Sequence, residues 1–435
     1  MARNHIITGL DIGTSSIKAL AVSKKSNSEE LEILSKIEKS NSGMRKGVVI
    51  KPEEVSQNIG SVLNQIRTES GKKIEEVYVN IGGSHIFSTL SRGSVVVSRA
   101  DQKISQEDIE RVIQAAKTFS LPPNKEIIDF FPRSFIVDEE FRVKEPLGMQ
   151  GIRMEAEILA IGVFSPYFKN LTEAVLNTGV QIADIICNPV SSAKACLTPQ
   201  QKELGVVLLD IGAGTTDISI YEEGDLVHLG VIPIGSSHIT NDIAIGLRTD
   251  TAVAERIKKE FGNCFKDSVK KNKKREKIEI PSASLARLSP AFFEKGRDLG
   301  GLAFSSKFLN KIIEARVCEI FDLVRKEIKK SSSGILPAGI VITGGGVKLP
   351  GIVDLAKREL KLPCRIGIPV FQQSFLENED SLKEDFGENS EKDPSFSTAW
   401  GLVLSGIENS PEKSFFGTRR GIVNKIKKVF RVFIP

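Results

Sequence analysis

Two aspartates in separate halves of the chain each end an apolar run and precede a turn of small residues. Asp11 lies in LDIGTSSIKA, and Asp210 lies in LLDIGAGTTDISI. Phosphate oxygens can be bound by backbone N–H groups at close range, and small residues let the main chain approach. An aspartate at the end of such a strand can hold Mg²⁺, usually through water, because Mg²⁺ dehydrates reluctantly. Two hairpins of this kind facing each other would clamp the phosphates of one nucleotide from opposite sides.

The two turns offer a defined set of backbone donors. The first supplies Gly13, Thr14 and Ser15, and the second supplies Gly212, Ala213, Gly214, Thr215 and Thr216. One such turn alone is usually a hairpin without a ligand, but two copies and a later glycine turn, VITGGGVKLPG, favour a nucleotide site. Neither turn is a Walker loop, and neither is a G-x-G-x-x-G loop that opens a helix.

Strand-like and helical runs alternate around these turns, which predicts an α/β architecture. Residues 6–12, 17–23 and 31–38 have the pattern of a three-stranded meander, and 52–70 has apolar residues at helical spacing. From about 83 to 165 the pattern changes to that of a small α+β insertion. The hairpins therefore belong to a larger framework that must bring them together.

The composition is that of an ordinary globular protein. The chain has 435 residues, 40% of them apolar and 26% charged, with a net charge of +5; this length allows two to four domains. The five cysteines are scattered without a C-x-x-C pair, which fits a reducing compartment and gives no zinc pattern. No apolar run approaches the ~20 residues that span a bilayer, and MARNHIITGLDIG runs straight into a strand. We expect a cytosolic, soluble body without a signal peptide.

The three glycine turns and their order resemble the actin-like ATPase superfamily. LDIGTSSIKA, LLDIGAGTTDISI and VITGGGVKLPGI are similar to its first phosphate, second phosphate and adenosine motifs. The resemblance implies an α/β, actin-like (ribonuclease H-like) two-domain fold whose cleft binds ATP and Mg²⁺, with Asp11 and Asp210 beside the metal. The nucleotide-binding residues that it implies are Asp11, Gly13, Thr14, Ser15, Lys18, Asp210, Gly212, Gly214, Thr215, Thr216, Gly235, Glu255, Lys258, Gly344, Gly345 and Gly346.

The resemblance also implies roles for the residues outside the two hairpin turns. Lys18 would reach a phosphate, and Gly235 would precede a helix whose N-terminus faces phosphate. AERIKKEFG is similar to a helix whose Glu255 and Lys258 hold the ribose and base, although a solvated helix face would have the same pattern. The backbone of residues 344–346 would lie against the adenosine.

Other segments resemble one family within this superfamily, the bacterial division proteins of the FtsA family. GGSHI and DEEFRVKEPLGMQGIRMEAEIL are similar to the opening and close of its inserted subdomain 1C, and DPSFSTAWGLVLSG to its last connecting helix. This resemblance implies filaments of the chain on the cytoplasmic side of the inner membrane at the septum. The partners that it implies are FtsZ through its C-terminal peptide, a second copy of the chain, an anionic lipid membrane and other divisome proteins.

The same resemblance gives an expected division of the chain. In order, the segments are 1–82 (first actin-like domain, 1A), 83–165 (inserted subdomain 1C), 166–204 (rest of 1A), 205–371 (second domain, 2A and 2B), 372–394 (acidic loop), 395–408 (closing helix), 409–418 (linker) and 419–435 (membrane-targeting helix).

The C-terminal stretch GIVNKIKKVFRVFI gives an independent physical argument for membrane binding. At helical spacing its apolar residues fall in one stripe of roughly 140°, with cations on the opposite face. Such a helix lies in the membrane plane, with apolar burial on one side and attraction to anionic lipid on the other. The residues concerned are Ile422, Val423, Ile426, Val429, Phe430 and Phe433 in the stripe, and Lys427, Lys428 and Arg431 opposite.

Asn188 in NPVSSAKAC is a departure from many FtsA-family sequences, which carry an acid before this proline. Relatives that hydrolyse ATP use this region, near Asp210, to orient water, and an amide cannot act as a base. We therefore expect slow or undetectable hydrolysis, with no residue assigned as the catalytic base.

Other functions remain as alternatives. A PilM-like adaptor of a type IV pilus machine shares a DIGSSSIK-like start but lacks the C-terminal membrane helix. A sugar kinase or a chaperone ATPase is less compatible, because the chain shows neither a clear carboxylate base for a substrate hydroxyl nor room for a peptide-binding domain. The lysine-rich run 266–277 lacks interleaved aromatic residues, so no nucleic-acid partner is expected.

Overall fold

The computed structural model describes residues 5–24, 31–265, 277–280, 302–331, 335–369 and 392–409. The predicted membrane helix 419–435 and the linker from 410 to 418 lie outside the described residues, as do most of the acidic loop 372–394 and nearly all of the basic run 266–277. Within the described part of the chain, no helix is long and apolar enough to cross a bilayer.

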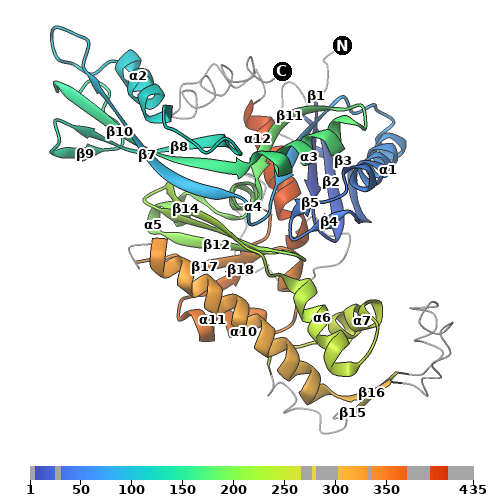
Figure 1. Ribbon diagram of the computed structural model, residues 1–435. Helices are drawn as coiled ribbons and strands as arrows, with labels where there is room; N and C mark the ends of the chain where they lie inside the picture. The colour runs from blue at the N-terminus through green and yellow to red at the C-terminus, as the bar shows by residue number, and fades with distance from the viewer. Residues whose placement is uncertain are drawn as a thin grey trace.

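Each half of the molecule is built on a five-stranded sheet with the same strand order and directions (Figure 1). In each, three strands form an antiparallel meander and two more continue it in parallel. The first sheet, in spatial order, contains β11 (Gln181–Cys187), β6 (Glu76–Ile81), β1 (His5–Ile12), β2 (Ser16–Lys24) and β3 (Leu31–Ser40). The second, listed from the corresponding edge, contains β18 (Cys364–Ile366), β17 (Ile340–Thr343), β12 (Val206–Ile211), β13 (Thr216–Glu222) and β14 (Asp225–Ile232).

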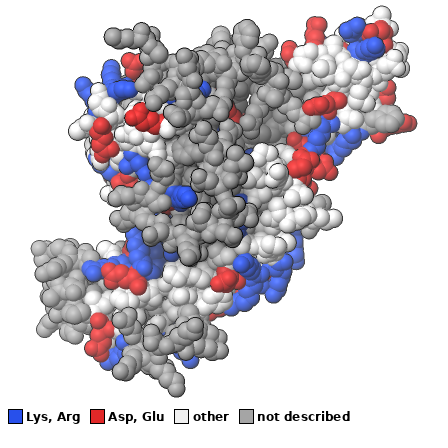
Figure 2. All heavy atoms as spheres, turned by 180° about the vertical axis from the view of Figure 1, so that it is seen from behind, with Lys and Arg blue, Asp and Glu red and all other residues white. Residues whose placement is uncertain are grey.

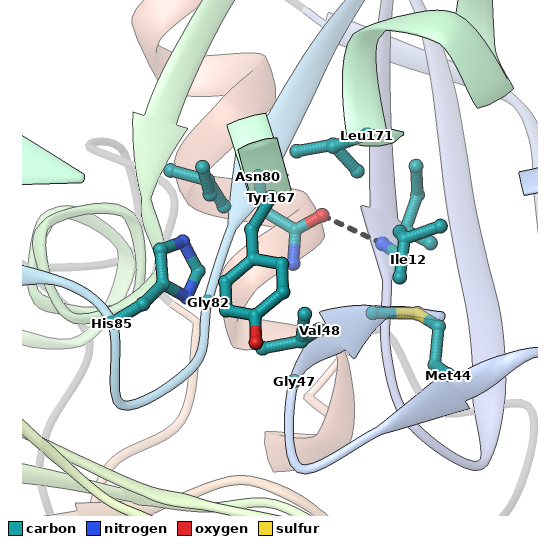
Figure 3. A pocket seen from close by; sticks show the side chains of 11 residues that line it. Ile12, Met44, Gly47, Val48, Asn80, Gly82, His85, Tyr167 and Leu171 are labelled. Carbon is teal, nitrogen blue, oxygen red and sulfur yellow. Dashed lines mark hydrogen bonds between the residues drawn. The ribbon is translucent and has the colours of Figure 1, made fainter. Parts of the chain in front are cut away.

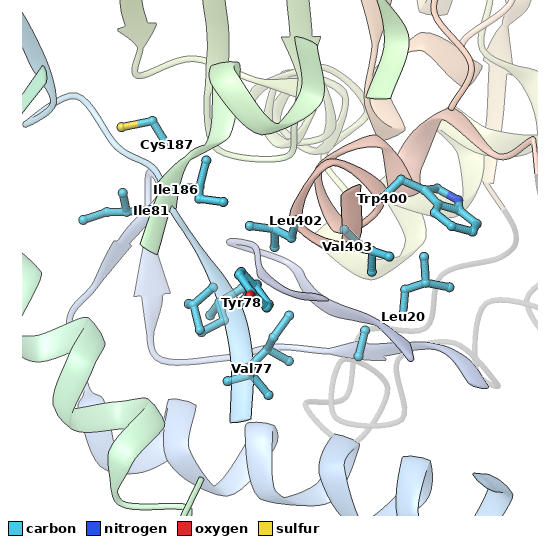
Figure 4. Packing of buried hydrophobic residues seen from close by; sticks show 14 of the residues in the cluster. Leu20, Val77, Tyr78, Ile81, Ile186, Cys187, Trp400, Leu402 and Val403 are labelled. Atoms are coloured by element: carbon cyan, nitrogen blue, oxygen red, sulfur yellow. The ribbon is translucent and has the colours of Figure 1, made fainter. Parts of the chain in front are cut away.

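Helices cover both faces of the first sheet. The amphipathic α1 (Pro52–Ser70) buries Val55, Ile59, Val62 and Ile66 and packs on β3 and on α3 (Ser165–Leu176). On the other face lies α12 (Ser397–Asn409), which packs on β1 and β6. Figure 4 shows Trp400, Leu402 and Val403 of α12 in the apolar layer with Leu20 and Tyr78.

Two helices cross closely between the two halves, because glycine stands at the crossing. A Cβ on Gly401 of α12 would lie 1.8 Å from the carbonyl oxygen of Ser191 in α4 (Asn188–Cys196). The crossing is also held by Lys194, whose ammonium lies 2.7 Å from the Glu408 carboxylate. These contacts fix α12 against α4 beside the cleft.

Four longer helices accompany the second sheet. They are α6 (Ser236–Leu247), α7 (Thr251–Phe261), α10 (Ser306–Ser331) and α11 (Ile352–Leu360). The long α10 contacts α6, α11 and β14, and it contributes Phe321 and Val324 to a second apolar core. The remaining short elements of the described residues are β4 (Met44–Arg45), β5 (Val48–Val49), α5 (Pro199–Leu204), β15 (Lys277–Ile280), β16 (Leu302–Ser305), η2 (Gly345–Lys348) and η5 (Pro394–Phe396).

The segment between β6 and α3 forms a separate sheet with its own core at one end of the molecule (Figure 1). Its strands, in spatial order, are β7 (Phe87–Val96), β10 (Arg153–Phe164), β8 (Lys125–Val137) and β9 (Phe141–Val143). One face is covered by α2 (Gln106–Lys117), which starts in a capping box between Ser105 and Asp108. We call this sheet with α2 the inserted subdomain.

Candidate nucleotide-binding cleft

A cleft of about 570 Å³ lies where the two halves meet, and the turns after β1, β12 and β17 all open into it. Most of the residues expected from the sequence line it. They are Asp11, Gly13, Thr14, Ser15, Lys18, Asn188, Asp210, Gly212, Gly214, Thr215, Gly344 and Gly345.

The first and second turns approach each other across this cleft. A Cβ on Gly214 would stand 2.7 Å from Thr14 Oγ1, and Thr14 Oγ1 in turn accepts a hydrogen bond of 2.9 Å from the Gly47 N–H. Only glycine allows the second turn to come this close to the first. The structure therefore has the opposed pair of turns that a phosphate clamp requires.

Asp11 lies at the floor of the cleft and is held by Asn80, the residue next to last in β6. Asn80 Nδ2 donates to Asp11 Oδ1 at 2.7 Å and to Asn188 Oδ1 at 2.9 Å, while its own Oδ1 accepts from the Ile12 N–H. Burial raises the pKa of Asp11 from 3.8 to about 7; nearby Lys18 opposes this and Asp210 adds to it. At neutral pH the carboxyl is therefore only partly ionised in the nucleotide-free protein.

Asp210 is oriented by hydroxyl groups from the two crossing helices. Ser192 Oγ of α4 donates to Asp210 Oδ2 at 2.5 Å, and Thr398 Oγ1 of α12 donates to the same oxygen at 3.1 Å. Burial raises the pKa of Asp210 as well, although both hydrogen bonds act in the opposite direction. Residues far apart in the sequence are therefore needed to hold this carboxylate.

Asp217 is a cleft residue that the sequence reasoning missed. In the two hairpins, Asp210 pairs with Asp217 in the same register in which Asp11 pairs with Lys18, so the repeat itself could have revealed it. Its Oδ2 accepts from Asn188 Nδ2 at 3.0 Å, and its buried Oδ1 has no partner among the described residues. Burial, with Asp210 nearby, raises the pKa of Asp217 to about 8.

These three carboxyl groups fit a hydrated magnesium ion. All three are buried and have raised pKa values, and Asp217 Oδ1 has no hydrogen-bond partner among the described residues. A bound cation would therefore offset the free-energy cost of ionising these buried carboxyl groups. Carboxylate and water oxygens are the ligands that Mg²⁺ prefers. No group of three acidic, thiol or imidazole side chains in the described ranges is placed to bind a metal directly. Asp11, Asp210 and Asp217 would hold the ion through its water molecules.

Lys18 lies in the cleft wall beside the first turn. Its Nζ donates to Ser16 Oγ at 3.0 Å and lies 3.5 Å from Glu38, and only 13% of its side chain is exposed. The lysine is thus held near the position from which it would contact a phosphate.

The third turn needs glycine for steric reasons. Gly344 has a φ of +89°, and a Cβ there would lie 2.2 Å from Asp210 Oδ1. Gly344 and Gly345 border the cleft, whereas Gly346 lies behind them against Ile211.

Besides Gly346, four predicted residues do not line the cleft as the structure stands. Glu255 and Lys258 form an ion pair of 2.6 Å with each other, and both also bond Thr240. Gly235 lies against the second turn, and the first two N–H groups of α6 donate to the carbonyls of Gly212 and Ala213. Thr216 Oγ1 donates to the Ile234 carbonyl. These contacts shape the second turn and its supporting helices.

A second, much smaller recess adjoins the cleft behind the first turn (Figure 3). It shares Ile12, Gly47 and Gly82 with the cleft and is closed by His85 and Tyr167, whose rings meet edge to face at 5.1 Å. Burial lowers the pKa of His85 to about 4, so its imidazole is neutral.

Two repeated α/β halves that enclose a cleft, with opposed phosphate-type turns, define a protein with the actin-like ATPase fold. The chain superposes on the "PilM-PilN type IV pilus biogenesis complex" with a TM-score of 0.59 at 16% identity, covering 92% of this chain and 98% of that one. It superposes on MreB5 of Spiroplasma citri bound to ADP with a TM-score of 0.52 at 14% identity, covering 94% and 99%. At these identities the likeness concerns the fold.

Sequence comparison places the chain within one family of that fold. Residues 207–401 match the family "Cell division protein FtsA", and residues 83–161 match the "SHS2 domain inserted in FTSA". The chain is 34% identical to Cell division protein FtsA of Pseudomonas aeruginosa, over 94% of this chain and 90% of the relative. It is 34% identical to that of Borreliella burgdorferi, over 98% and 96%, and 32% identical to that of Bacillus subtilis, over 85% and 80%. The chain belongs to the FtsA family of cell division proteins.

Proposed function

We propose that this chain binds Mg-ATP in the cleft, assembles into filaments on the cytoplasmic side of the inner membrane, and tethers FtsZ filaments there at the septum. The observation that carries the nucleotide part is the approach of Gly214 to Thr14, which opposes two phosphate-type turns across one cleft. The MreB5 structure of the same fold holds ADP, which supports a nucleotide ligand.

In the proposed complex, the chain supplies binding groups rather than strong catalysis. The backbone N–H groups of the two turns and Lys18 would hold the phosphates. The carboxylates of Asp11, Asp210 and Asp217 would hold hydrated Mg²⁺, which would neutralise phosphate charge. Asn188 cannot accept a proton, and Asp217, which accepts a hydrogen bond from it, would be engaged with the hydrated ion. ATP would therefore act mainly as an assembly ligand, with slow turnover.

The membrane and FtsZ parts rest on different support. The C-terminal sequence has the amphipathic, basic pattern of an in-plane membrane helix, and a short helix of this kind binds reversibly. Filament formation would multiply such anchors and strengthen attachment. Membership of the FtsA family supports the proposed FtsZ contact, the other divisome partners and the septal location. No described contact favours the pilus-adaptor alternative over this one.

Two measurements test the proposal separately. Titration of the purified chain with ATP, with and without Mg²⁺, tests the cleft; absence of saturable binding would contradict the nucleotide assignment. Co-sedimentation with anionic vesicles compares the full chain with a version that ends at Ser410. We expect the full chain to pellet, more so with ATP, and the shortened chain to stay in solution; equal pelleting would remove the membrane-tether role.

A further inference from the structure

The inserted subdomain has one sheet face that α2 does not cover. The residues of its core, among them Val137, Met154 and Ile158, point toward α2. Side chains alternate between the two faces of a strand, so their neighbours along the strands point to the opposite face. On that face, Glu157 of β10 stands directly across from Arg92 of β7 and from Ser134 of β8.

Three arginines converge on this one carboxylate. Arg92 donates through Nε and Nη2 to Glu157 Oε2 at 3.1 and 2.8 Å. Arg142 and Arg133 approach Oε1 at 3.1 and 3.5 Å. The Glu157 side chain is only 5% exposed, while those of Arg92 and Arg142 are 63% and 57% exposed. We call Arg92, Arg133 and Arg142 with Glu157 and Ser134 the arginine face.

The arginine face has more positive charge than its buried acid requires. One guanidinium would neutralise Glu157, and bringing three together costs free energy because the positive charges repel one another. Two other acids of this subdomain, Glu139 and Glu155, are paired with Arg153 at 2.8 and 2.9 Å. In addition, the buried hydroxyl of Ser134, a residue 8% exposed, has no hydrogen-bond partner in the described structure. Surplus charge and an unpaired hydroxyl on one face are what a receptor for an anionic group presents.

The chemistry of the face favours carboxylates of a protein segment. Guanidinium groups bind carboxylates with two parallel hydrogen bonds, and Arg92 and Arg142 have exposed N–H groups left for this. The side of the subdomain that carries the arginine face also contacts the second domain: Ser88 Oγ donates to the Leu229 carbonyl of β14, and Lys144 lies 3.2 Å from Asp225. Figure 2 shows the described basic and acidic side chains mixed over the outer end of this subdomain, not a uniform basic surface suited to a membrane.

The chain itself contains a segment of matching charge. Residues 377–391 hold seven acidic residues and a single lysine. This segment leaves the second sheet after β18, which is the edge strand opposite β14, while the inserted subdomain contacts β14. The two edges are four strand spacings of about 4.8 Å apart, a distance that does not by itself assign the segment to one copy. The inference rests on the proposed function, in which copies assemble into filaments, and it therefore assigns the segment to a second copy.

We propose that the arginine face binds the acidic segment 377–391 of a second copy of this chain. In this contact, the exposed guanidinium groups of one copy pair with carboxylates of the other. The contact gives a function both to the surplus arginines and to the acidic segment. Because the contact is made by exposed charges, it weakens as salt rises.

The test measures binding of a labelled synthetic peptide of residues 376–391 to the full chain by fluorescence anisotropy. We expect saturable binding that weakens at least tenfold in Arg92→Gln/Arg142→Gln, in which Arg133 still neutralises Glu157. Arg99→Gln is the matched control, because Arg99 is an equally exposed arginine of the same subdomain paired with Asp101. A peptide with Asn and Gln in place of its acids should not bind.

Three outcomes would overturn the proposal. The first is no binding to the unmodified chain, and the second is equal binding by the double variant. The third is binding that appears, at chain concentrations too low for copies to associate, only after the acids of 377–391 in the full chain are replaced by amides, which would show that the segment already occupies the face of its own chain. ATP affinity and the thermal unfolding midpoint, measured on the same variants, separate a failed contact from a misfolded protein or an empty nucleotide cleft.

Discussion

Gly214 and Thr14, from turns in opposite halves of the chain, lie so close that a single methyl group would not fit between them. A Cβ on Gly214 would stand 2.7 Å from Thr14 Oγ1 and 3.1 Å from the Cα of Lys46. The distance between the two turns is therefore set by the absence of a side chain at one position.

Replacing Gly214 by valine should weaken ATP binding at least tenfold, because the side chain forces the two turns apart and the phosphates lose donors from one side. Isothermal titration with ATP measures the change. Gly60→Ala is a suitable control: it lies in α1 with nothing within 4 Å of the added Cβ, so it should leave ATP binding unchanged and stabilise the helix by about 0.5–1 kcal/mol. Unaltered ATP affinity in Gly214→Val would show that the turns do not act as a clamp.

The buried carboxyls of the cleft predict an unusual dependence of stability on pH. Asp11 and Asp217 have pKa values raised from 3.8 to about 7 and about 8, so between pH 4 and 8 the folded chain binds more protons than the unfolded chain. Stability contributed by these groups is present at low pH and is lost as pH rises, by at most about 1.4 kcal/mol per pH unit for each group. The nucleotide-free protein should therefore have a lower unfolding midpoint at pH 8 than at pH 6.

Mg-ATP should reverse this trend, because the cation stabilises the ionised carboxylates. Differential scanning fluorimetry at pH 6 and 8 should show a larger rise in midpoint on adding Mg-ATP at pH 8. Asp217→Asn removes one of the titrating groups, so it should flatten the pH dependence of the free protein. A midpoint that is higher at pH 8 than at pH 6 without ligand would disprove the role assigned to these carboxyls.

The hairpins could be predicted because their signals are local. An apolar strand, an aspartate and a turn of small residues fall within a few positions, and the second copy repeats the pattern with the same strand order. The sequence also indicated the inserted subdomain, whose sheet runs from β7 to β10. The closing helix, expected over 395–408, begins with a 3₁₀ turn and runs as α12 from Ser397 to Asn409.

The supporting contacts could not be predicted because they depend on tertiary packing. Asn80 reaches Asp11 from another strand, and Thr398 reaches Asp210 from a helix 188 positions away. Asp217 was overlooked although it occupies the position of Lys18 in the repeated hairpin. The seven-residue spacing carried that information, but a lysine in one copy and an aspartate in the other conceal the correspondence.

The ion pair between Glu255 and Lys258 provides a test of nucleotide contacts beyond the phosphates. If both hold the ribose and base, Lys258→Ala should weaken ATP binding about tenfold but leave tripolyphosphate binding unchanged. Lys259→Ala is the control on the same helix, since its side chain is 72% exposed and interacts only at 3.6 Å with Glu255. Equal affinity of Lys258→Ala for ATP would assign the pair to the packing of α7 on α6.

Introducing a carboxylate at position 188 should speed hydrolysis. In Asn188→Asp, the new side chain would still accept from Asn80 and would adjoin Asp217, now as two carboxyls that share a proton. One of the two would be ionised at neutral pH and able to accept a proton from water, and general bases contribute about 10²–10⁴-fold to such reactions. We expect phosphate release to rise at least tenfold, while Asn188→Ala shows no increase. Phosphate release by Asn188→Asp no faster than by the unmodified chain, with ATP affinity retained, would mean that the missing acid does not limit turnover.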